Sequence, residues 1–316
     1  MSDFLNQSLK GRCLFGIPKK GEPFISIADR ITVLRRLYEK CVQLLSGADI
    51  QFTRSHRLDV ALVRNHNMAL VFLPAADIPR FVGEGNVHFG ITGQDMVAEA
   101  DVNGLVEETL QLGFGKCKLQ VQVPERSEIK KVEDLVGKKV VTSFEVLAGR
   151  YFDKLDSTAG GTPQTKIEYV GGSVEAACAL GLADGIVDLV ESGETMRAAG
   201  LHAIETILSS EAVLIRSNKP DATHNELIER ITSRIAGVIA ASKYVLCNYN
   251  ISRGNLAQAT HITPGRRAAT VSPLDDPEWV AVSSMVLKAE VADVMDRLTA
   301  IGATDVLVIG LTNCRV

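Results

Sequence analysis

The sequence predicts an α/β protein with two α/β lobes, followed by a small α+β domain. Apolar runs of strand length alternate with helical patterns from Cys13 to Asp95, and a second alternation begins near Gly113. Such alternation is typical of a mainly parallel sheet with helices packed on it. The polar segment 217–225, which contains Pro220, separates these elements from a third group.

The first lobe is expected to span residues 1–112 and to include a return segment at 200–220. Its strands are predicted at 13–17, 60–63, 70–73 and 87–92, and its helices at 37–45 and 74–85. The second lobe is expected at 113–199, with strands ending at Val123 and at 140–142, 166–170 and 185–190, and helices near 132–136 and at 175–182. Two such lobes around a cleft resemble the periplasmic-binding-protein-like architecture.

Residues 225–316 are expected to form a ferredoxin-like α+β domain. A long helical pattern covers 226–244, and further helices are predicted at 254–260 and 289–301. Strands are predicted at 244–248, 268–271, 280–286 and 305–309. This architecture is suited to small-ligand regulation or oligomerisation.

Composition restricts the class of protein. The chain has 316 residues, 46% of them hydrophobic, which is enough for two or three domains with sizeable cores. No apolar run approaches the roughly 18 residues of a membrane span, and the first residues do not form an export signal. The six cysteines are scattered without metal-binding spacing, as expected for a reduced, cytoplasmic protein. A net charge of −4 argues against a general nucleic-acid binder.

A polar loop after the strand 185–190 is the clearest functional signal. The loop runs from Glu191 to Thr195 and is followed by helix-forming residues. Loop amides and hydroxyls at such a junction can bind a phosphate, and Gly193 permits a close backbone approach. Taken alone, the loop is equally compatible with an ordinary capped turn.

Asp188 favours the binding-site interpretation. A carboxylate inside an apolar strand is costly to bury unless it has a partner, so we expect it at the open end of the strand, facing hydroxyls or a metal. Asp188, Glu191 and Glu194 would repel a bare phosphate. They suit a sugar phosphate, whose hydroxyls donate to carboxylates, with Mg²⁺ offsetting the remaining negative charge.

The same region resembles a known family signature. The matching positions are Glu175, Gly181, Ala183, Ile186, Asp188, Leu189, Ser192, Gly193, Thr195 and Met196. In order and spacing they resemble the signature of the ATP phosphoribosyltransferases, the enzymes that begin histidine biosynthesis. The resemblance implies transfer of phosphoribosyl from phosphoribosyl pyrophosphate to N1 of ATP, with release of pyrophosphate. It implies that residues 188–195, including Glu194, hold the donor, with Asp188 and Glu191 beside the reacting sugar.

Further substrate-binding residues follow from the resemblance, which covers nearly the whole chain. Lys20, Arg36 and Arg57, together with Mg²⁺, are expected to carry the negative charge of pyrophosphate or of the ATP triphosphate. Asp95 ends a family-like Gly-Ile-Thr-Gly-Gln-Asp segment and is also assigned to the substrate site. Family members often carry Asp where this chain has His88.

One segment departs from the family pattern. In eukaryotic-type members a Pro-Lys-Lys-Gly turn runs straight into Arg-Leu-Tyr-Glu-Lys-Cys, whereas here Glu22 to Arg35 separate Lys20 from Arg36. We expect this segment to be either a surface loop or an artefact of gene prediction.

Thr270 and Ser272 mark a candidate regulatory site. They lie in a Thr-Val-Ser-Pro-Leu stretch that resembles the carboxyl-terminal regulatory domain of the family's long form. That domain binds histidine between subunits, so the resemblance implies feedback inhibition by histidine and a homo-oligomer, either a dimer or a hexamer. A domain used only for assembly is the alternative.

Two other functions stay open at this point. Two α/β lobes around a cleft also serve solute-binding or sensor modules, which capture a ligand without chemistry. The separation of Lys20 from Arg36 makes a catalytically inert regulatory subunit conceivable.

Overall fold

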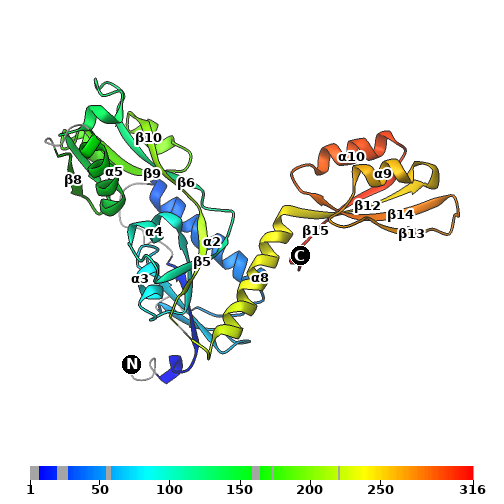
Figure 1. Cartoon of the computed structure of the whole chain (residues 1–316). Coiled ribbons are helices and arrows are strands. Elements are labelled where there is room, and N and C mark those ends of the chain that lie inside the picture. The colour runs from blue at the N-terminus through cyan, green and yellow to red at the C-terminus, as the bar shows by residue number, and fades with distance from the viewer. Residues whose placement is uncertain are drawn as a thin grey trace. The chain divides into compact units, whose positions relative to one another are not determined.

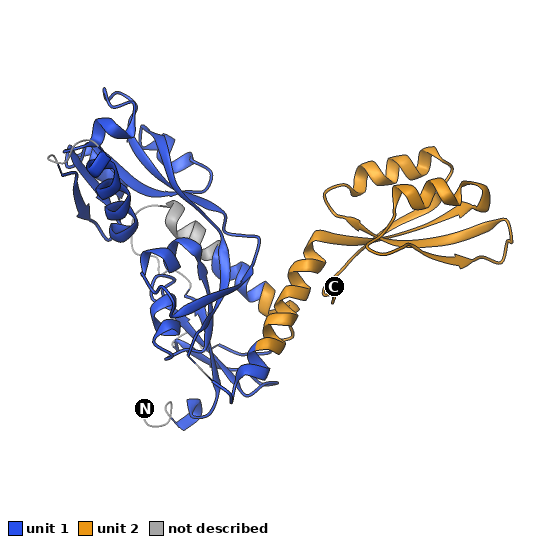
Figure 2. Ribbon diagram, in the orientation of Figure 1, with its two compact units in different colours: residues 1–43, 50–228 blue, residues 44–49, 229–316 orange. Residues whose placement is uncertain are grey.

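The computed structural model describes residues 7–19, 28–54, 58–158, 164–172, 174–219 and 221–315. For residues 28–36 only the backbone is described. The chain forms two compact units (Figure 2). Unit 1 comprises Met1–Gln43 and Ile50–Ile228, and unit 2 comprises Leu44–Asp49 and Glu229–Val316.

The first lobe of unit 1 is built on a six-stranded sheet in the order β2-β3-β1-β4-β11-β5 (Figure 1). The strands are β1 (Cys13–Pro18), β2 (Val60–Leu62), β3 (Met68–Leu73), β4 (Phe89–Gly93), β5 (Val106–Gln111) and β11 (Ala212–Ser217). β1 pairs in parallel with β3 and β4, whereas β11 runs antiparallel to β4 and β5. Helix α3 (Ile78–Gly83) buries Ile78 and Val82 against Val213 and Ile215 of β11.

The second lobe is built on a five-stranded sheet in the order β10-β6-β9-β7-β8. Its elements are β6 (Cys117–Pro124), η1 (Val132–Leu135), β7 (Lys139–Thr142), α5 (Glu145–Thr158), β8 (Lys166–Tyr169), α6 (Val174–Ala179), β9 (Gly185–Val190), α7 (Glu194–Ala198) and β10 (Leu201–Ser210). One face of the sheet buries Leu119, Val121 and Val187 against Phe152 of α5. The other face contributes Ile186 to a separate core that contains residues of α6.

Helix α4 (Gln94–Glu99) connects β4 to β5 within the first lobe and contacts the second lobe. Met96 packs against the core of the second lobe. The carboxylate of Glu99 accepts the backbone N–H groups of Val146 and Leu147, at 2.8 and 2.9 Å. A negative charge is favourable at this position because the first amides of a helix have no partner within the helix.

The position of β10 corrects the predicted boundary of the first lobe. Residues 200–220 were assigned to that lobe, but Leu201–Ser210 pair with β6 in the sheet of the second lobe. The chain returns to the first lobe only at Glu211, immediately before β11. Backbone pairing with β6 extends from Leu201 to Ser210. The prediction failed because local hydrophobic periodicity does not show which distant strand a segment pairs with.

Helix α2 (Ala28–Gly47) begins inside the segment that was expected to be a surface loop. The loop prediction for Glu22 to Arg35 is therefore wrong for residues 28–35, which continue the helical pattern of 37–45 towards the N-terminus. Residues 22–27 lie outside the described part of the chain.

Unit 2 has the predicted ferredoxin-like topology. Its elements are α8 (Asn225–Lys243), which begins in unit 1, then β12 (Tyr244–Ser252), η2 (Arg253–Asn255), α9 (Leu256–Ile262), β13 (Thr270–Pro273), β14 (Trp279–Leu287), α10 (Val291–Ala300) and β15 (Thr304–Gly310). The sheet order β13-β14-β12-β15 is antiparallel throughout. Helices α9 and α10 cover one face (Figure 1), where Ala259 and Leu298 pack against Tyr249.

The predicted fold class is thus confirmed, with two α/β lobes and a carboxyl-terminal α+β domain. The expectation of mainly parallel sheets is wrong, because β2, β5, β6, β10 and β11 pair antiparallel with their neighbours and the sheets of both lobes are mixed. Among the helices that the structure describes, none combines the length and apolar character needed to cross a bilayer.

Candidate active site

A cavity of about 730 Å³ in unit 1 contains part of the predicted phosphate loop. Its wall combines the end of β9 and α7 with residues of β6, β10 and the start of α4. The polar and charged residues that line it, together with Gly193, are Gln94, Lys116, Lys118, Gln120, Glu191, Ser192, Arg197, Ser209, Ser210 and Glu211. The cavity therefore offers amides, hydroxyls and charges of both signs, which suits a polar, charged ligand.

The loop between β9 and α7 is shaped by Gly193. This residue has φ +77°, in the left-handed region that favours glycine, and it directly precedes α7. The guanidinium of Arg197 folds back and donates to the carbonyl oxygen of Ser192, at 3.2 Å. Glu191, Ser192 and Glu194 are exposed, and Thr195 is half-buried.

Asp188 lies two residues before the end of β9 and is half-buried. It stands directly opposite Gln120 of β6. Paired residues on antiparallel strands point to the same face, so the side chains of Asp188 and Gln120 share one face of the sheet. Leu119 and Val187 point the other way, into the hydrophobic core.

Asp95 is 4% exposed and sits at the start of α4. Its carboxylate accepts a hydrogen bond from Ser210, so its contact in this structure is internal. Burial raises the pKa of Asp95 and outweighs the opposing hydrogen bonds from Ser210 and from backbone amides. Burial, with the nearby charge of Asp95, also raises the pKa of the Cys117 thiol to about 12.

Several predicted residues cannot be compared with this cavity. Lys20 and Arg57 lie outside the described residues, and only the backbone of Arg36 is described, within α2. Thr270 and Ser272 lie on β13 in unit 2, where both are exposed.

Sequence reasoning missed Lys116, Lys118, Arg197 and Ser210. The two lysines line the cavity at the start of β6, and Ser210 ends β10. The available signal for the lysines was the pattern Gly-Lys-Cys-Lys at the start of a strand, which places two charges close together. No local pattern indicates that this strand runs beside the 191–195 loop.

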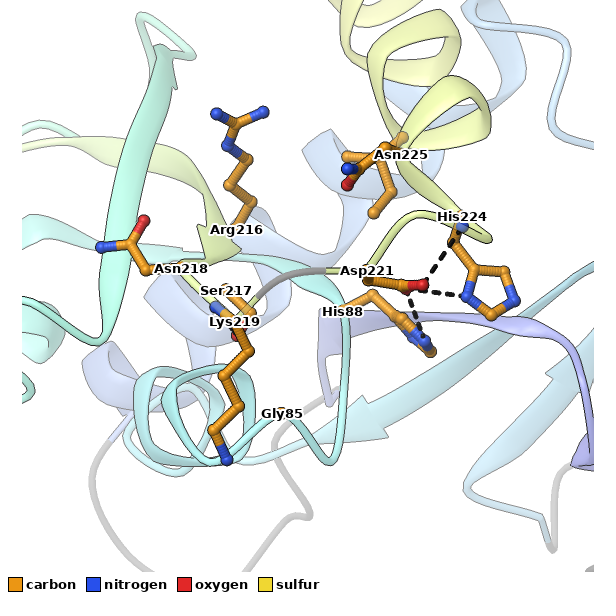
Figure 3. Close-up of a pocket in the computed structure, with 10 residues that line it drawn as sticks. Gly85, His88, Arg216, Ser217, Asn218, Lys219, Asp221, His224 and Asn225 are labelled. Carbon is orange, nitrogen blue, oxygen red and sulfur yellow. Dashed lines mark hydrogen bonds and ion pairs between the residues drawn. The ribbon is translucent and has the colours of Figure 1, made fainter.

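A second cavity of unit 1, of about 440 Å³, lies at the connection between β11 and α8 (Figure 3). Figure 3 shows His88, Asp221 and His224 converging there. Oδ2 of Asp221 lies 2.8 Å from Nδ1 of His224 and 3.4 Å from Nε2 of His88. Oδ1 of Asp221 accepts the backbone N–H groups of Thr223 and His224, so this carboxylate also caps the turn that leads into α8.

These three side chains hold one potential ligand atom each, all within 4.8 Å of one another, yet their hydrogen bonds do not fit a metal. The backbone N–H of Leu14 donates to Nδ1 of His88 at 2.8 Å, so the ring proton of His88 is on Nε2, the nitrogen that faces Asp221. A histidine that binds a metal needs a lone pair on that nitrogen and a proton on the other. The cluster is therefore a hydrogen-bonded cap.

Comparison with known proteins identifies the family. Residues 74–237 match the family described as ATP phosphoribosyltransferase, and residues 241–313 match the family described as HisG, C-terminal domain. A relative from Yarrowia lipolytica named ATP phosphoribosyltransferase is 57% identical over 314 residues, covering 99% of this chain and 100% of the relative.

The chain belongs to the ATP phosphoribosyltransferase family. A second relative with this name, from Schizosaccharomyces pombe, is 53% identical over 323 residues, with 99% of each chain covered. The resemblance found in residues 175–196 is confirmed, as is the long form with its carboxyl-terminal domain. Membership of the ATP phosphoribosyltransferase family makes the chain a pentosyltransferase of histidine biosynthesis. This assignment takes the place of the two alternatives, a sensor module and an inert subunit.

A solved structure has a fold similar to that of this chain. The ATP phosphoribosyl transferase (HisG:HisZ) complex from Thermotoga maritima matches 73% of this chain and 98% of the compared chain, with 21% identity and a TM-score of 0.58. At this identity the likeness concerns the fold.

Proposed function

We propose that phosphoribosyl transfer takes place in the 730 Å³ cavity of unit 1. The bond between C1 of the ribose and the pyrophosphate oxygen breaks, its electron pair leaves with pyrophosphate, and N1 of the adenine of ATP forms the new bond to C1. The observation that carries this proposal is that Glu191, Ser192 and Gly193 line the cavity directly after the strand that carries Asp188. Asp188, Glu194 and Thr195 are not among the lining residues.

Each requirement of the reaction has residues to meet it. In the proposal, Ser192, Thr195 and the loop amides hold the 5-phosphate, while Asp188 and Glu191 accept ribose hydroxyls close to the electron-poor sugar. Positioning two bound reactants supplies much of the acceleration, because N1 of adenine is already a free nucleophile. The mechanism therefore needs no strong general base.

We further propose that the bound cation is Mg²⁺, held by the acidic residues of the donor loop. Mg²⁺ prefers oxygen ligands, and Asp188, Glu191 and Glu194 supply carboxylates within seven positions of sequence. When bound, Mg²⁺ neutralises phosphate oxygens of the substrates. Lys20, Arg36 and Arg57 remain proposed contacts to pyrophosphate or to the ATP triphosphate, and Asp95 remains a proposed substrate-site residue.

Unit 2 is proposed to bind histidine as a feedback inhibitor at Thr270 and Ser272. Support comes from the match to the C-terminal family domain and from the exposure of both side chains on β13. A homo-oligomer, dimer or hexamer, and a cytoplasmic location complete the proposal.

Release of pyrophosphate is the decisive measurement. Purified protein mixed with ATP, Mg²⁺ and phosphoribosyl pyrophosphate is expected to release pyrophosphate only when all three are present. Asp188→Asn is expected to remove this activity, whereas Asp153→Asn, a change on the exposed surface of α5, leaves it intact. Normal turnover by the Asp188 variant would contradict the placement of the site.

A further inference from the structure

Two lysines on the strand next to the donor loop are the feature that the proposed mechanism leaves unused. Lys118 belongs to β6, and Lys116 precedes that strand by one residue. Both are exposed, and both line the 730 Å³ cavity. Among the residues that the structure describes, neither lysine forms an ion pair.

Strand register places these lysines beside the loop. Lys118 pairs with Val190, the last residue of β9, and Gln120 pairs with Asp188. Because side chains alternate along a strand, Lys118 shares the face of Gln120 and Asp188 and is a diagonal neighbour of Asp188. β6 runs antiparallel to β9, so Lys116 lies further towards the loop that follows Val190.

The charges of the loop explain why neighbouring cations are needed. Asp188, Glu191 and Glu194 are carboxylates, and Arg197 is the one cation between Asp188 and Ala199. The cavity wall adds the carboxylate of Glu211. Without Lys116 and Lys118, the carboxylates of Glu191 and Glu211 would be opposed by Arg197 alone, and a phosphate would face net negative charge. The two lysines make the net charge of the lining side chains positive.

We propose that Lys116 and Lys118 bind the 5-phosphate of the ribosyl donor, opposite the amides of the 191–195 loop. This inference rests on the proposed function of the same cavity. Lysine suits the role because its ammonium is a point charge with three donors on a flexible stem, which can follow a phosphate without a fixed geometry. Both lysines hold the donor in place and take no part in bond making.

The test measures binding of ribose 5-phosphate, a probe that carries the phosphate without the pyrophosphate. Calorimetry on the full chain compares the normal protein with Lys118→Gln, with Lys116→Gln and with the double variant. Loss of charged hydrogen bonds is expected to weaken ribose 5-phosphate binding about 10- to 100-fold in the double variant. Lys118→Arg, which keeps the charge, is expected to retain most of the affinity.

Two controls separate the possible outcomes. Lys154→Gln changes an exposed lysine of α5 outside the cavity and is expected to bind the probe normally. Inorganic pyrophosphate and ATP are titrated in parallel, and their affinities are expected to stay within about twofold of normal. Unchanged binding of ribose 5-phosphate by the double variant, or a loss confined to pyrophosphate or ATP, would overturn the inference.

Failure of this inference can be told apart from failure of the proposed function. A normal protein that releases pyrophosphate from donor and ATP, together with lysine variants that bind ribose 5-phosphate normally, refutes the role of the lysines alone. A normal protein that releases none refutes the proposed function itself. Equal melting temperatures of all variants show that the changes are local to the site.

Discussion

The hydroxyl of Ser210 donates to Oδ1 of Asp95 over 2.5 Å and also accepts the backbone N–H of Asp95 at 3.0 Å. The two residues are 115 positions apart in the sequence. Ser210 ends the last strand of the second lobe, and Asp95 lies in the first turn of α4, which connects β4 to β5 of the first lobe. This buried contact therefore fixes the end of β10, where the chain returns to the first sheet, against α4.

Replacing Ser210 by Ala tests that contact. The variant leaves the buried carboxylate without its hydroxyl donor, and we expect it to lower the free energy of unfolding by about 1–3 kcal/mol. Burial raises the pKa of Asp95 because it disfavours the ionised carboxylate in the folded state. This cost to the free energy of unfolding is absent below the ordinary pKa and increases as the pH rises from the ordinary pKa through the folded pKa. Urea unfolding should show a larger loss at pH 7 than at pH 4. A similar loss in Ser209→Ala, which is exposed on the same strand, would argue against this account.

Gly193→Ala is expected to reduce turnover about 10²-fold, because a substrate displaced by about 1 Å is no longer aligned for reaction. The added Cβ would occupy a left-handed backbone position, at a cost of about 1–2 kcal/mol, and would displace the tip of Arg197. Gly104→Ala is the matched control, because Gly104 has φ +73° and open space around it, away from the cavity. Equal kcat values for the two variants would show that backbone strain alone explains the loss.

His88 provides a prediction on pH. Burial, followed by the charge of His224, lowers its pKa despite the opposing effect of Asp221. Because the pKa of His88 is lower in the folded state than the unfolded value of 6.5, the unfolded state binds a proton first as the pH falls. The free energy of unfolding therefore decreases as the pH falls from 6.5 towards the folded pKa. We expect the normal protein to lose stability between pH 7 and pH 5 in urea unfolding, whereas His88→Asn removes this contribution.

The same position distinguishes hydrogen bonding from packing. Asn places its Oδ1 where Nδ1 of His88 accepts the Leu14 amide, whereas Ala leaves that amide without an acceptor. His88→Ala is therefore expected to be about 1–2 kcal/mol less stable than His88→Asn at pH 7. Equal stability of the two variants would show that the Leu14 contact contributes nothing.

Removing divalent ions is expected to abolish pyrophosphate release, and added Mg²⁺ is expected to restore it. Chelation with EDTA followed by a Mg²⁺ titration measures this directly. His88→Asn should leave the Mg²⁺ requirement unchanged, because the hydrogen bonds of the His88 cluster are incompatible with a metal. Full activity in EDTA would remove the metal from the mechanism.

Histidine is expected to inhibit the normal protein, and Ser272→Ala is expected to raise the half-inhibitory concentration about 3- to 10-fold, the effect of one lost hydrogen bond. Ser272 pairs with Ala281 on the sheet face opposite α9 and α10, where a ligand can reach it. Asp296→Asn, an exposed change on α10, serves as the control. Indifference of the normal protein to histidine would remove the regulatory proposal.

Local patterns in the sequence predicted many of the elements, but not α4, β5 or α5. The strand at 185–190, the loop after it and the ferredoxin-like order of unit 2 all follow from hydrophobic periodicity and turn residues. These features depend on neighbours in the chain, so a single sequence contains the information.

Features that depend on pairing between distant segments were not predictable in this way. The assignment of β10 to the second sheet depends on its ladder with β6. The approach of Lys118 to Asp188 depends on the register of β6 against β9, and a shift of one residue would turn Lys118 into the core. Neither register can be read from the periodicity of either strand alone.

The contact of Glu99 with α5 has a practical consequence for anyone who dissects this enzyme. A fragment cut after the first sheet would begin its next helix with bare amides at Val146 and Leu147, because the acid that satisfies them is supplied from the other side of the cut. A polypeptide made for substrate-binding work should therefore contain both sheets.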